Sequence, residues 1–297
     1  MKKLYGIVCA NVTPMNGDGS IDLFSLSKLV DHMAESGIHS VYPCGTNGEG
    51  ILLSPAEHHA VADRVIQQNN GRMSAFIQCA SVRWEETMVN IQYACSRGAD
   101  GVGVMTPIFY KADDTAMLDY YHEAAQAADS KPVYLYNISK YTNNDVSPQT
   151  FAKIIEQNEN IAGIKYSAKE IERIEDYLRL PSRKPDVLIG ADSLFLSALA
   201  IGCVGEVSGP ACVFPRWYVG VYESFIKGDM ESALYYQNQI VKCSRSIKSV
   251  PQIPAIKAML KMQGIISDDK CRRPFRKLTS EEYGLLEDAL EMYAKEQ

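Results

Sequence analysis

The stretch from Val133 to Lys165 reads VYLYNISKYTNNDVSPQTFAKIIEQNENIAGIK and contains one strand–helix–strand unit. It begins with the short apolar run Val133–Tyr136 and ends with a second run, Ile161–Lys165. Between them, Pro148–Gln157 has the composition of a helix that starts with proline in its first turn. Short apolar runs bounded by Gly, Pro, Asn or Asp are typical of buried strands. The order strand, helix, strand therefore predicts two parallel neighbouring strands.

The same alternation extends over most of the chain. Six more strand-like runs are Tyr5–Ala10, Ser40–Cys44, Ser74–Cys79, Gly101–Met105, Val187–Ile189 and Val204–Val207. Further helical segments are Leu23–Glu35, Pro55–Asn69, Glu85–Ser96, Thr115–Ala128, Glu170–Leu178, Ser193–Ile201 and Pro215–Lys227. Eight strand–helix units within about 225 residues predict an α/β fold of the closed (β/α)8 TIM barrel type.

The remainder of the chain reads as helices only: Met230–Ile247, Ile253–Gln263 and Ser280–Lys295. We therefore expect a barrel over residues 1–229 and a C-terminal helical extension over residues 230–297. No long Gly-, Ser- or Pro-rich linker separates the two parts, so we expect them to pack as one domain. The extension contains no residue that we expect to be catalytic.

Composition and charge exclude several classes of function. The net charge of -6 argues against a nucleic-acid surface, because phosphate binding needs clustered lysine and arginine. No apolar run is long enough to span a bilayer, and the N-terminus lacks a cleavable signal pattern, so we expect a cytoplasmic protein. The eight cysteines form no C-x-x-C pair, and His58 and His59 point in different directions on a helix, so we expect no metal site.

The active site of such a barrel lies at the C-terminal ends of the strands, where Lys165 closes the sixth strand. Period-2 alternation predicts that Ile161, Gly163 and Lys165 share one face, which we assign to the barrel interior. Burial disfavours the ammonium form of a lysine, and the neutral amine is a nucleophile for carbonyl groups. The alternative is a lysine that extends its charged end to solvent.

Two further features lie at the same end of the barrel. Tyr136 ends the fifth strand, and neighbouring strands are about 4.8 Å apart, so its phenol can exchange protons with a group bound to Lys165. The loop Gly45–Gly50 offers backbone N–H groups and the Thr46 hydroxyl, which can hold a carboxylate. Alternatively, the tyrosine is an aromatic residue of the rim and the loop is simply a turn.

Taken together, these residues resemble the N-acetylneuraminate lyase and dihydrodipicolinate synthase family, the pyruvate-dependent Schiff-base class I aldolases. The motifs that carry the resemblance are Gly45-Thr46-Asn47-Gly48-Glu49, Tyr136-Asn137 and Gly163-Ile164-Lys165. The resemblance runs from Thr13-Pro14 to Arg273-Pro274-Phe275, which is almost the whole chain.

The resemblance implies a role for each matching residue. Lys165 would form a Schiff base with the keto carbon of pyruvate, and Tyr136 would act as general acid and base. Thr46 and the N–H groups of the Thr46–Asn47 loop would hold the pyruvate carboxylate. Tyr110 would cap the site from a neighbouring subunit of a homotetramer built as a dimer of dimers, and Val207 would lie beside the imine. No cofactor other than the covalent lysine Schiff base is implied.

Departures from the family pattern bear on the second substrate. Asn47 replaces a second hydroxyl residue, and Tyr141 stands where dihydrodipicolinate synthases carry an arginine for the carboxylate of aspartate semialdehyde. Sialic acid lyases have Gly-Tyr-Asp-Glu after strand seven, and here the residues are Gly190-Ala191-Asp192-Ser193. The polar lining of Ser167, Asp192, Ser193 and Ser208 suits a hydroxylated aldehyde.

The sequence therefore favours a lyase acting on a 2-keto-3-deoxy sugar acid or a sialic-acid-like substrate, with dihydrodipicolinate synthesis as the alternative. Two other classes of function stay open. A phosphate-dependent lysine aldolase would need basic residues in the last two strand loops, which instead hold Asp192 and Glu206. A non-catalytic ligand-binding barrel would be expected to lose Lys165 or Tyr136, although Asn47 is in its favour.

Overall fold

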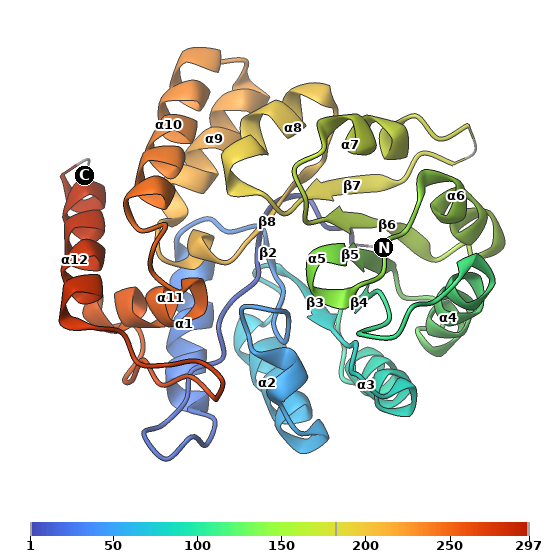
Figure 1. Ribbon diagram of the computed structural model, residues 1–297, viewed down its shortest axis with the longest axis horizontal. Helices are drawn as coiled ribbons and strands as arrows, with labels where there is room; N and C mark the ends of the chain where they lie inside the picture. The colour runs from blue at the N-terminus through green and yellow to red at the C-terminus, as the bar shows by residue number, and fades with distance from the viewer. Residues whose placement is uncertain (1, 182, 296–297) are drawn as a thin grey trace.

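The computed structural model describes residues 2–181 and 183–295, and within them eight parallel strands form a closed barrel (Figure 1). The strands are β1 (Gly6–Cys9), β2 (Ser40–Val41), β3 (Ser74–Gln78), β4 (Gly101–Met105), β5 (Val133–Asn137), β6 (Ile161–Tyr166), β7 (Asp186–Ile189) and β8 (Gly205–Ser208). Pairing of β8 with β1 closes the sheet. The predicted (β/α)8 TIM barrel is confirmed.

Helices connect successive strands and surround the barrel (Figure 1). They are α1 (Leu23–Glu35), α2 (Pro55–Asn69), α3 (Trp84–Ser96), α4 (Asp114–Ala127), α6 (Pro148–Gln157), α7 (Ile171–Leu178), α8 (Phe195–Ile201) and α9 (Pro215–Lys227). Local sequence fixes their starts: the Ser54 side chain accepts from the N–H of Glu57, whose carboxylate accepts from the N–H of Ser54. The segment predicted as one helix from Ser193 is a 3-10 turn, η2 (Asp192–Leu194), followed by α8.

Three helices form the C-terminal extension, α10 (Met230–Ser246), α11 (Gln252–Met262) and α12 (Ser280–Ala294). They lie together on one side of the barrel, with α12 outermost (Figure 1). Eight successive residues of α11, from Ile253 to Leu260, are buried. The expected domain limits at residues 1 and 297 lie outside the described residues. No helix in the part of the chain that the structure describes is long and apolar enough to cross a bilayer.

Two layers of apolar side chains fill the molecule. The inner layer occupies the barrel and consists of Leu4, Val8, Ala10, Tyr42, Phe76, Tyr134, Leu188 and Val207. The outer and larger layer lies between the strands and the surrounding helices. The interior is therefore a packed core, which leaves the C-terminal ends of the strands as the place for a site.

A bulge in β6 changes which residues face the interior. The register between β5 and β6 shifts, so that Val133 pairs with Ile161 but Tyr134 pairs with Gly163. Ile161 consequently packs in the outer layer, while Ala162 contacts the inner one. The prediction that Ile161 shares the face of Lys165 is therefore wrong, because one extra residue interrupts the period-2 alternation.

Candidate active site

Lys165 lies inside the barrel, beside two tyrosines. It pairs in register with Tyr136 across β5 and β6, and its side chain nitrogen lies 3.8 Å from the centroid of the Tyr136 ring. The ring of Tyr42 is 5.6 Å from the same nitrogen. Lys165 is 5% exposed and Tyr136 is 2% exposed, so the amine does not extend to solvent. The alternative of a solvated lysine at the strand end is thereby excluded.

Tyr42 was not identified from the sequence, where it is one aromatic residue in an apolar run. Its phenol reaches across the barrel to β4, where a Cβ atom at Gly103 would overlap its hydroxyl group. Burial raises the pKa of Tyr42 well above its usual value, and nearby Tyr136 raises it further. Tyr42 is therefore a neutral phenol next to the amine of Lys165.

The glycine-rich loop after β2 approaches the same place. The hydroxyl groups of Thr46 and Tyr136 are 3.2 Å apart. The loop is tight, because Cys44 and Glu49 both have positive φ, at 61° and 55°. A Cβ atom at Gly50 would overlap the carbonyl oxygen of Cys44, so only glycine fits there. The backbone amides of the loop are thus held in a fixed geometry next to the tyrosine.

Asn47 lies against the loop that follows β8. A Cβ atom at Gly209 would lie 2.5 Å from the side chain nitrogen of Asn47. The glycine therefore makes room for an amide that is larger than the hydroxyl residue expected at this position. The structure brings the strand-2 loop and the strand-8 loop together through this contact.

A buried ion pair ties the glycine-rich loop to the C-terminal extension. Glu49 accepts a hydrogen bond of 2.5 Å from Lys257 of α11, and both side chains are fully buried. The second carboxylate oxygen of Glu49 accepts from the N–H of Arg272 at 2.8 Å. The extension, in which no catalytic residue was expected, therefore positions the loop. Sequence reasoning missed this pair, because no spacing rule relates residues 208 positions apart.

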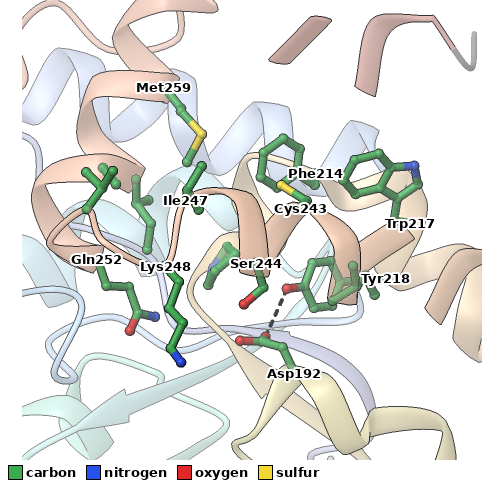
Figure 2. Close-up of a pocket in the computed structure, with 15 residues that line it drawn as sticks. Asp192, Phe214, Trp217, Tyr218, Cys243, Ser244, Ile247, Lys248, Gln252 and Met259 are labelled. Carbon is green, nitrogen blue, oxygen red and sulfur yellow. Dashed lines mark hydrogen bonds between the residues drawn. The ribbon is translucent and has the colours of Figure 1, made fainter. Parts of the chain in front are cut away.

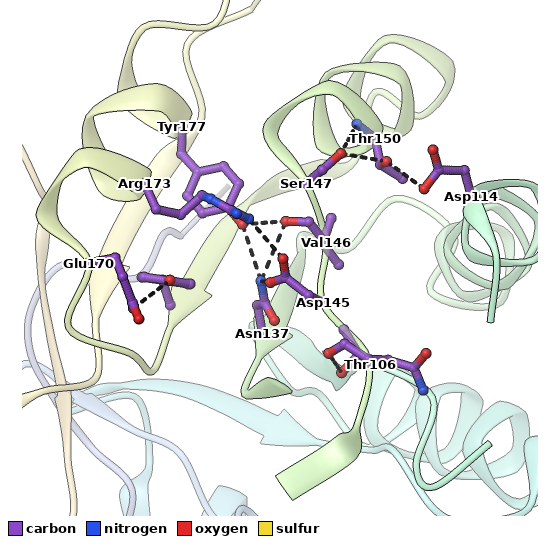
Figure 3. Close-up of polar contacts among 12 residues, drawn as sticks. Thr106, Asp114, Asn137, Asp145, Val146, Ser147, Thr150, Glu170, Arg173 and Tyr177 are labelled. Atoms are coloured by element: carbon purple, nitrogen blue, oxygen red, sulfur yellow. Dashed lines mark hydrogen bonds and ion pairs between the residues drawn. The ribbon is translucent and has the colours of Figure 1, made fainter. Parts of the chain in front are cut away.

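A second polar network anchors the end of β5 (Figure 3). The side chain amide of Asn137 donates to Asp145 at 2.8 Å and to the hydroxyl of Tyr177 at 3.1 Å. Arg173 of α7 forms an ion pair of 2.8 Å with the same aspartate. Asn137 directly follows Tyr136, so this network fixes the strand end that carries the tyrosine.

Residues after β6 and β7 form another wall of the site. A Cβ atom at Gly190 would overlap the hydroxyl of Ser167 and would lie 3.2 Å from Cε of Lys165. These three predicted residues are therefore neighbours. Val207 belongs to the inner layer of the barrel, whereas the side chain of Ser193 is exposed.

Asp192 lies two residues after Gly190, and its carboxylate accepts hydrogen bonds from two hydroxyl groups. One of its carboxylate oxygens accepts from the hydroxyl of Ser208 at 2.5 Å and from the hydroxyl of Tyr218 at 2.9 Å. Its backbone carbonyl accepts from Gln237 of α10 at 2.9 Å. The structure thus brings together Asp192 and Ser208, which the sequence predicted as site residues, with Tyr218 and Gln237, which the sequence did not predict.

Asp192 also lines a cavity of about 220 Å³ between α9 and the extension (Figure 2). Its apolar walls include Phe214, Trp217, Ile240, Ile247, Ile256 and Met259. Its polar lining includes Asp192, Tyr218, Ser244, Lys248 and Gln252. Two thirds of this lining comes from α10, α11 and their connection, in which the sequence predicted no catalytic residue.

Tyr110 lies apart from these residues on the surface of this chain. Its side chain is 79% exposed and contacts the ring of Phe109, with 5.0 Å between the ring centroids. Phe109, itself 69% exposed, has a φ of 77°, in the region that side chains rarely adopt. Two large exposed aromatic residues thus stand on a strained loop after β4.

Comparisons with known proteins identify a family and several relatives of this chain. Residues 3–293 match the family model described as the dihydrodipicolinate synthetase family. An uncharacterized DapA-like lyase of Halobacterium salinarum is 33% identical over 96% of this chain and 92% of its own length. A probable 2-dehydro-3-deoxy-D-pentonate aldolase of Escherichia coli is 26% identical, over 95% and 94%. The crystal structure of dihydrodipicolinate synthase from Aquifex aeolicus superimposes with a TM-score of 0.93 at 25% identity, covering 98% of both chains.

Proposed function

Because the chain belongs to the dihydrodipicolinate synthetase family, an enzyme family of lyases and aldolases, we propose that it is a Schiff-base aldolase with Lys165 as its nucleophile. The observation that carries the proposal is the buried amine of Lys165, 3.8 Å from the centroid of the Tyr136 ring. A buried lysine beside a proton-transferring phenol is the arrangement that imine formation needs.

The reaction follows from these two groups. The amine of Lys165 attacks the keto carbon of the substrate, and Tyr136 supplies a proton to the oxygen that leaves as water. Tyr136 then takes the proton of the C4 hydroxyl as the bond between C3 and C4 breaks. The protonated imine accepts the electrons of that bond, so that an aldehyde is released and an enamine remains. Protonation of C3 and hydrolysis of the imine then release pyruvate and restore the amine. In the reverse direction, the enamine attacks the aldehyde.

The loop after β2 is suited to hold the carboxylate of the bound keto acid. The hydroxyl of Thr46 lies 3.2 Å from that of Tyr136, which supports a position of the loop next to the reacting carbon. Backbone N–H groups of Thr46 and Asn47 would complete this binding site, as fixed dipoles that need little reorganisation. The hydroxyl group of Thr46 would also relay protons to Tyr136.

For the aldehyde half, we propose a hydroxylated group, as in a 2-keto-3-deoxy sugar acid or a sialic-acid-like substrate. Ser167 and Gly190 beside Lys165, and then Asp192, Ser193 and Ser208, would line its path. Hydroxyl and carboxylate groups recognise sugar hydroxyls through hydrogen bonds. The E. coli relative named as a pentonate aldolase supports the same class of substrate.

Dihydrodipicolinate synthesis is the second candidate, and the Aquifex structure favours it. That reaction needs a cation for the carboxylate of aspartate semialdehyde. Tyr141 stands at the place of the family's arginine, and it is 61% exposed. The neighbouring Lys140 lies over the ring of Tyr141, with 5.6 Å between the charge and the centroid. A flexible lysine is a poor substitute for a bidentate arginine, so we rank this function second.

We further propose a cytoplasmic homotetramer in which Tyr110 of one subunit completes the site of its neighbour. The exposure of Tyr110 and Phe109 supports this arrangement, because large aromatic side chains on a strained loop are typical of protein interfaces. No cofactor would be required, because the lysine itself supplies the electron sink.

Borohydride trapping tests the mechanism. The protein is mixed with pyruvate, reduced and analysed by mass spectrometry, next to the variant Lys165→Ala. We expect one pyruvyl adduct per chain, located at Lys165 and absent from the variant. Absence of the adduct, or an adduct at another lysine, would contradict the assignment of Lys165 and favour a non-catalytic ligand-binding barrel. A screen of hydroxylated and carboxylated aldehydes then separates the two candidate substrates.

A further inference from the structure

Glu206 is a buried carboxyl group without a donor. It lies in β8, and its exposed fraction is 0%. Among the described residues, neither of its carboxylate oxygens receives a hydrogen bond. An ionised carboxylate that is buried without donors is so costly that the group takes up a proton instead. Glu206 therefore needs a partner that can accept a hydrogen bond.

The position of Glu206 in β8 identifies that partner. Val207 faces the barrel interior, so alternation along the strand directs Glu206 toward the helix layer. Asp192 interacts with both Glu206 and Ser208: it accepts from the hydroxyl of Ser208, and its charge acts on the carboxyl group of Glu206. Tyr218 of α9 donates to the same aspartate from the side of the cavity (Figure 2).

The charges around the pair determine which group carries the proton. Burial raises the pKa of Glu206 well above its usual value, and the neighbouring Asp192 raises it further. Lys165 acts in the opposite direction, but it is the weaker influence. Asp192 already accepts two hydroxyl hydrogen bonds, so it is positioned as the acceptor of the pair. A carboxyl pair of this kind shares one proton, with Glu206 as the donor and Asp192 as the acceptor.

We propose that the carboxyl group of Glu206 donates a hydrogen bond to Asp192 and thereby sets the preference of the site for hydroxylated aldehydes. The inference rests on the proposed aldolase function and deepens it. Ser208 and Tyr218 donate hydrogen bonds to one oxygen of Asp192, and Glu206 donates a third hydrogen bond to its carboxylate. Together they hold this carboxylate in one orientation at the cavity. The carboxylate can then accept a further hydrogen bond from a substrate hydroxyl. Glu206 is a positioning residue and does not touch the substrate.

Two substitutions at Glu206 separate this role from others. Glutamine keeps the shape and a donating N–H group, whereas leucine keeps the volume and removes the donor. The assay measures condensation of pyruvate with D-glyceraldehyde, which has hydroxyl groups, and with propanal, which has none. We expect Glu206→Leu to raise KM for glyceraldehyde about tenfold and to leave KM for propanal within about twofold, as for loss of one hydrogen bond to a charged group. Glu206→Gln should recover most of that loss.

Three results would overturn the inference. Impairment of the glutamine variant to the level of the leucine variant would mean that Glu206 acts through its charge. An unchanged glyceraldehyde KM in the leucine variant would mean that it has no role in recognition. Loss of the borohydride adduct in that variant would place its effect at Lys165. Failure of the wild-type protein to form the adduct contradicts the proposed function itself, and so is distinguishable. If the leucine variant does not fold, the glutamine variant alone shows whether Glu206 acts as a hydrogen-bond donor or through its charge.

Discussion

At the scale of single residues, the contact between Asn47 and Gly209 offers a test of the carboxylate loop. Gly209 has helical backbone angles, φ -77° and ψ -51°, so alanine fits the backbone there. Its methyl group would lie 2.5 Å from the Asn47 side chain and displace it. We expect Gly209→Ala to raise the pyruvate concentration for half-maximal trapping by up to about tenfold, because displacement of the loop weakens the binding of pyruvate.

The matched control is Gly209→Ala combined with Asn47→Ser. Serine removes the amide that blocks the new methyl group, so the double variant should trap pyruvate better than Gly209→Ala alone. Such non-additivity is the signature of two side chains in direct contact. If the two substitutions instead add, Asn47 and Gly209 act independently and the loop is not positioned through their contact.

At this scale, the sequence predicted the residues of the strand ends but not their partners. Lys165 and Tyr136 could be paired, because consecutive strands of a barrel are neighbours and each residue ends its strand. The bulge at Ala162 could not be predicted, because it depends on the pairing of Val133 with Ile161 across two strands. The carboxyl pair of Glu206 and Asp192 was hidden for the same reason: Asp192 was predicted to bind substrate hydroxyl groups, whereas Glu206 was interpreted only as a charge that repels phosphate.

At the scale of elements, the ion pair between Glu49 and Lys257 connects the carboxylate loop to α11. Replacing Lys257 by methionine would leave Glu49 buried and unpaired, and we expect a loss of about 3–5 kcal/mol in the free energy of unfolding. Urea denaturation at a fixed protein concentration measures this loss. The double variant Glu49→Gln/Lys257→Met removes both charges and should recover a large part of it, because glutamine still accepts from the N–H of Arg272.

The same two variants report on function. If the pair positions the loop, trapping of pyruvate by folded Lys257→Met should require more pyruvate than trapping by the wild type. A variant as stable and as active as the wild type would show that Glu49 is satisfied by Arg272 alone and that α11 does not hold the loop.

Element by element, helices were predicted more accurately than strands. Leu23–Glu35 and Pro55–Asn69 match the structure residue for residue, because caps and prolines are local signals. The strand predicted at Ser40–Cys44 ends at Val41, because Cys44 takes a positive φ to enter the glycine-rich loop. The functional part of the extension escaped prediction, since α11 acts through contacts with residues about 200 positions away.

At the scale of the whole molecule, the position of Tyr110 predicts that sites are shared between subunits. Tyr110→Phe and Lys165→Ala should each be inactive alone. In mixed oligomers obtained by coexpression, the site with an intact Lys165 can receive an intact Tyr110 from its partner. We expect activity to return to about one site in four if the subunits mix at random. No recovery in mixtures shown to be heteromeric would mean that Tyr110 acts within its own chain or not at all.

The stability of the whole molecule should depend on pH through His58. Its ring nitrogen Nε2 lies 2.7 Å from the carbonyl oxygen of Gln78, and burial lowers the pKa of His58 to about 4. In the unfolded chain a histidine has a pKa of about 6.5, so unfolding takes up a proton between these values. The contribution of neutral His58 is therefore complete above pH 6.5 and is lost as the pH falls toward 4. The difference corresponds to about 3 kcal/mol at most.

The variant His58→Gln isolates this contribution, because its amide can donate to the carbonyl of Gln78 but does not titrate. Between pH 6.5 and 4, the free energy of unfolding of the wild type should fall further than that of the variant, by up to about 3 kcal/mol. Urea denaturation at several pH values and one protein concentration measures both slopes. His32 and His39, whose pKa values burial also lowers, are common to the two proteins, so their effect cancels in the difference. Parallel slopes would mean that His58 becomes protonated in the folded protein without the cost that its burial implies.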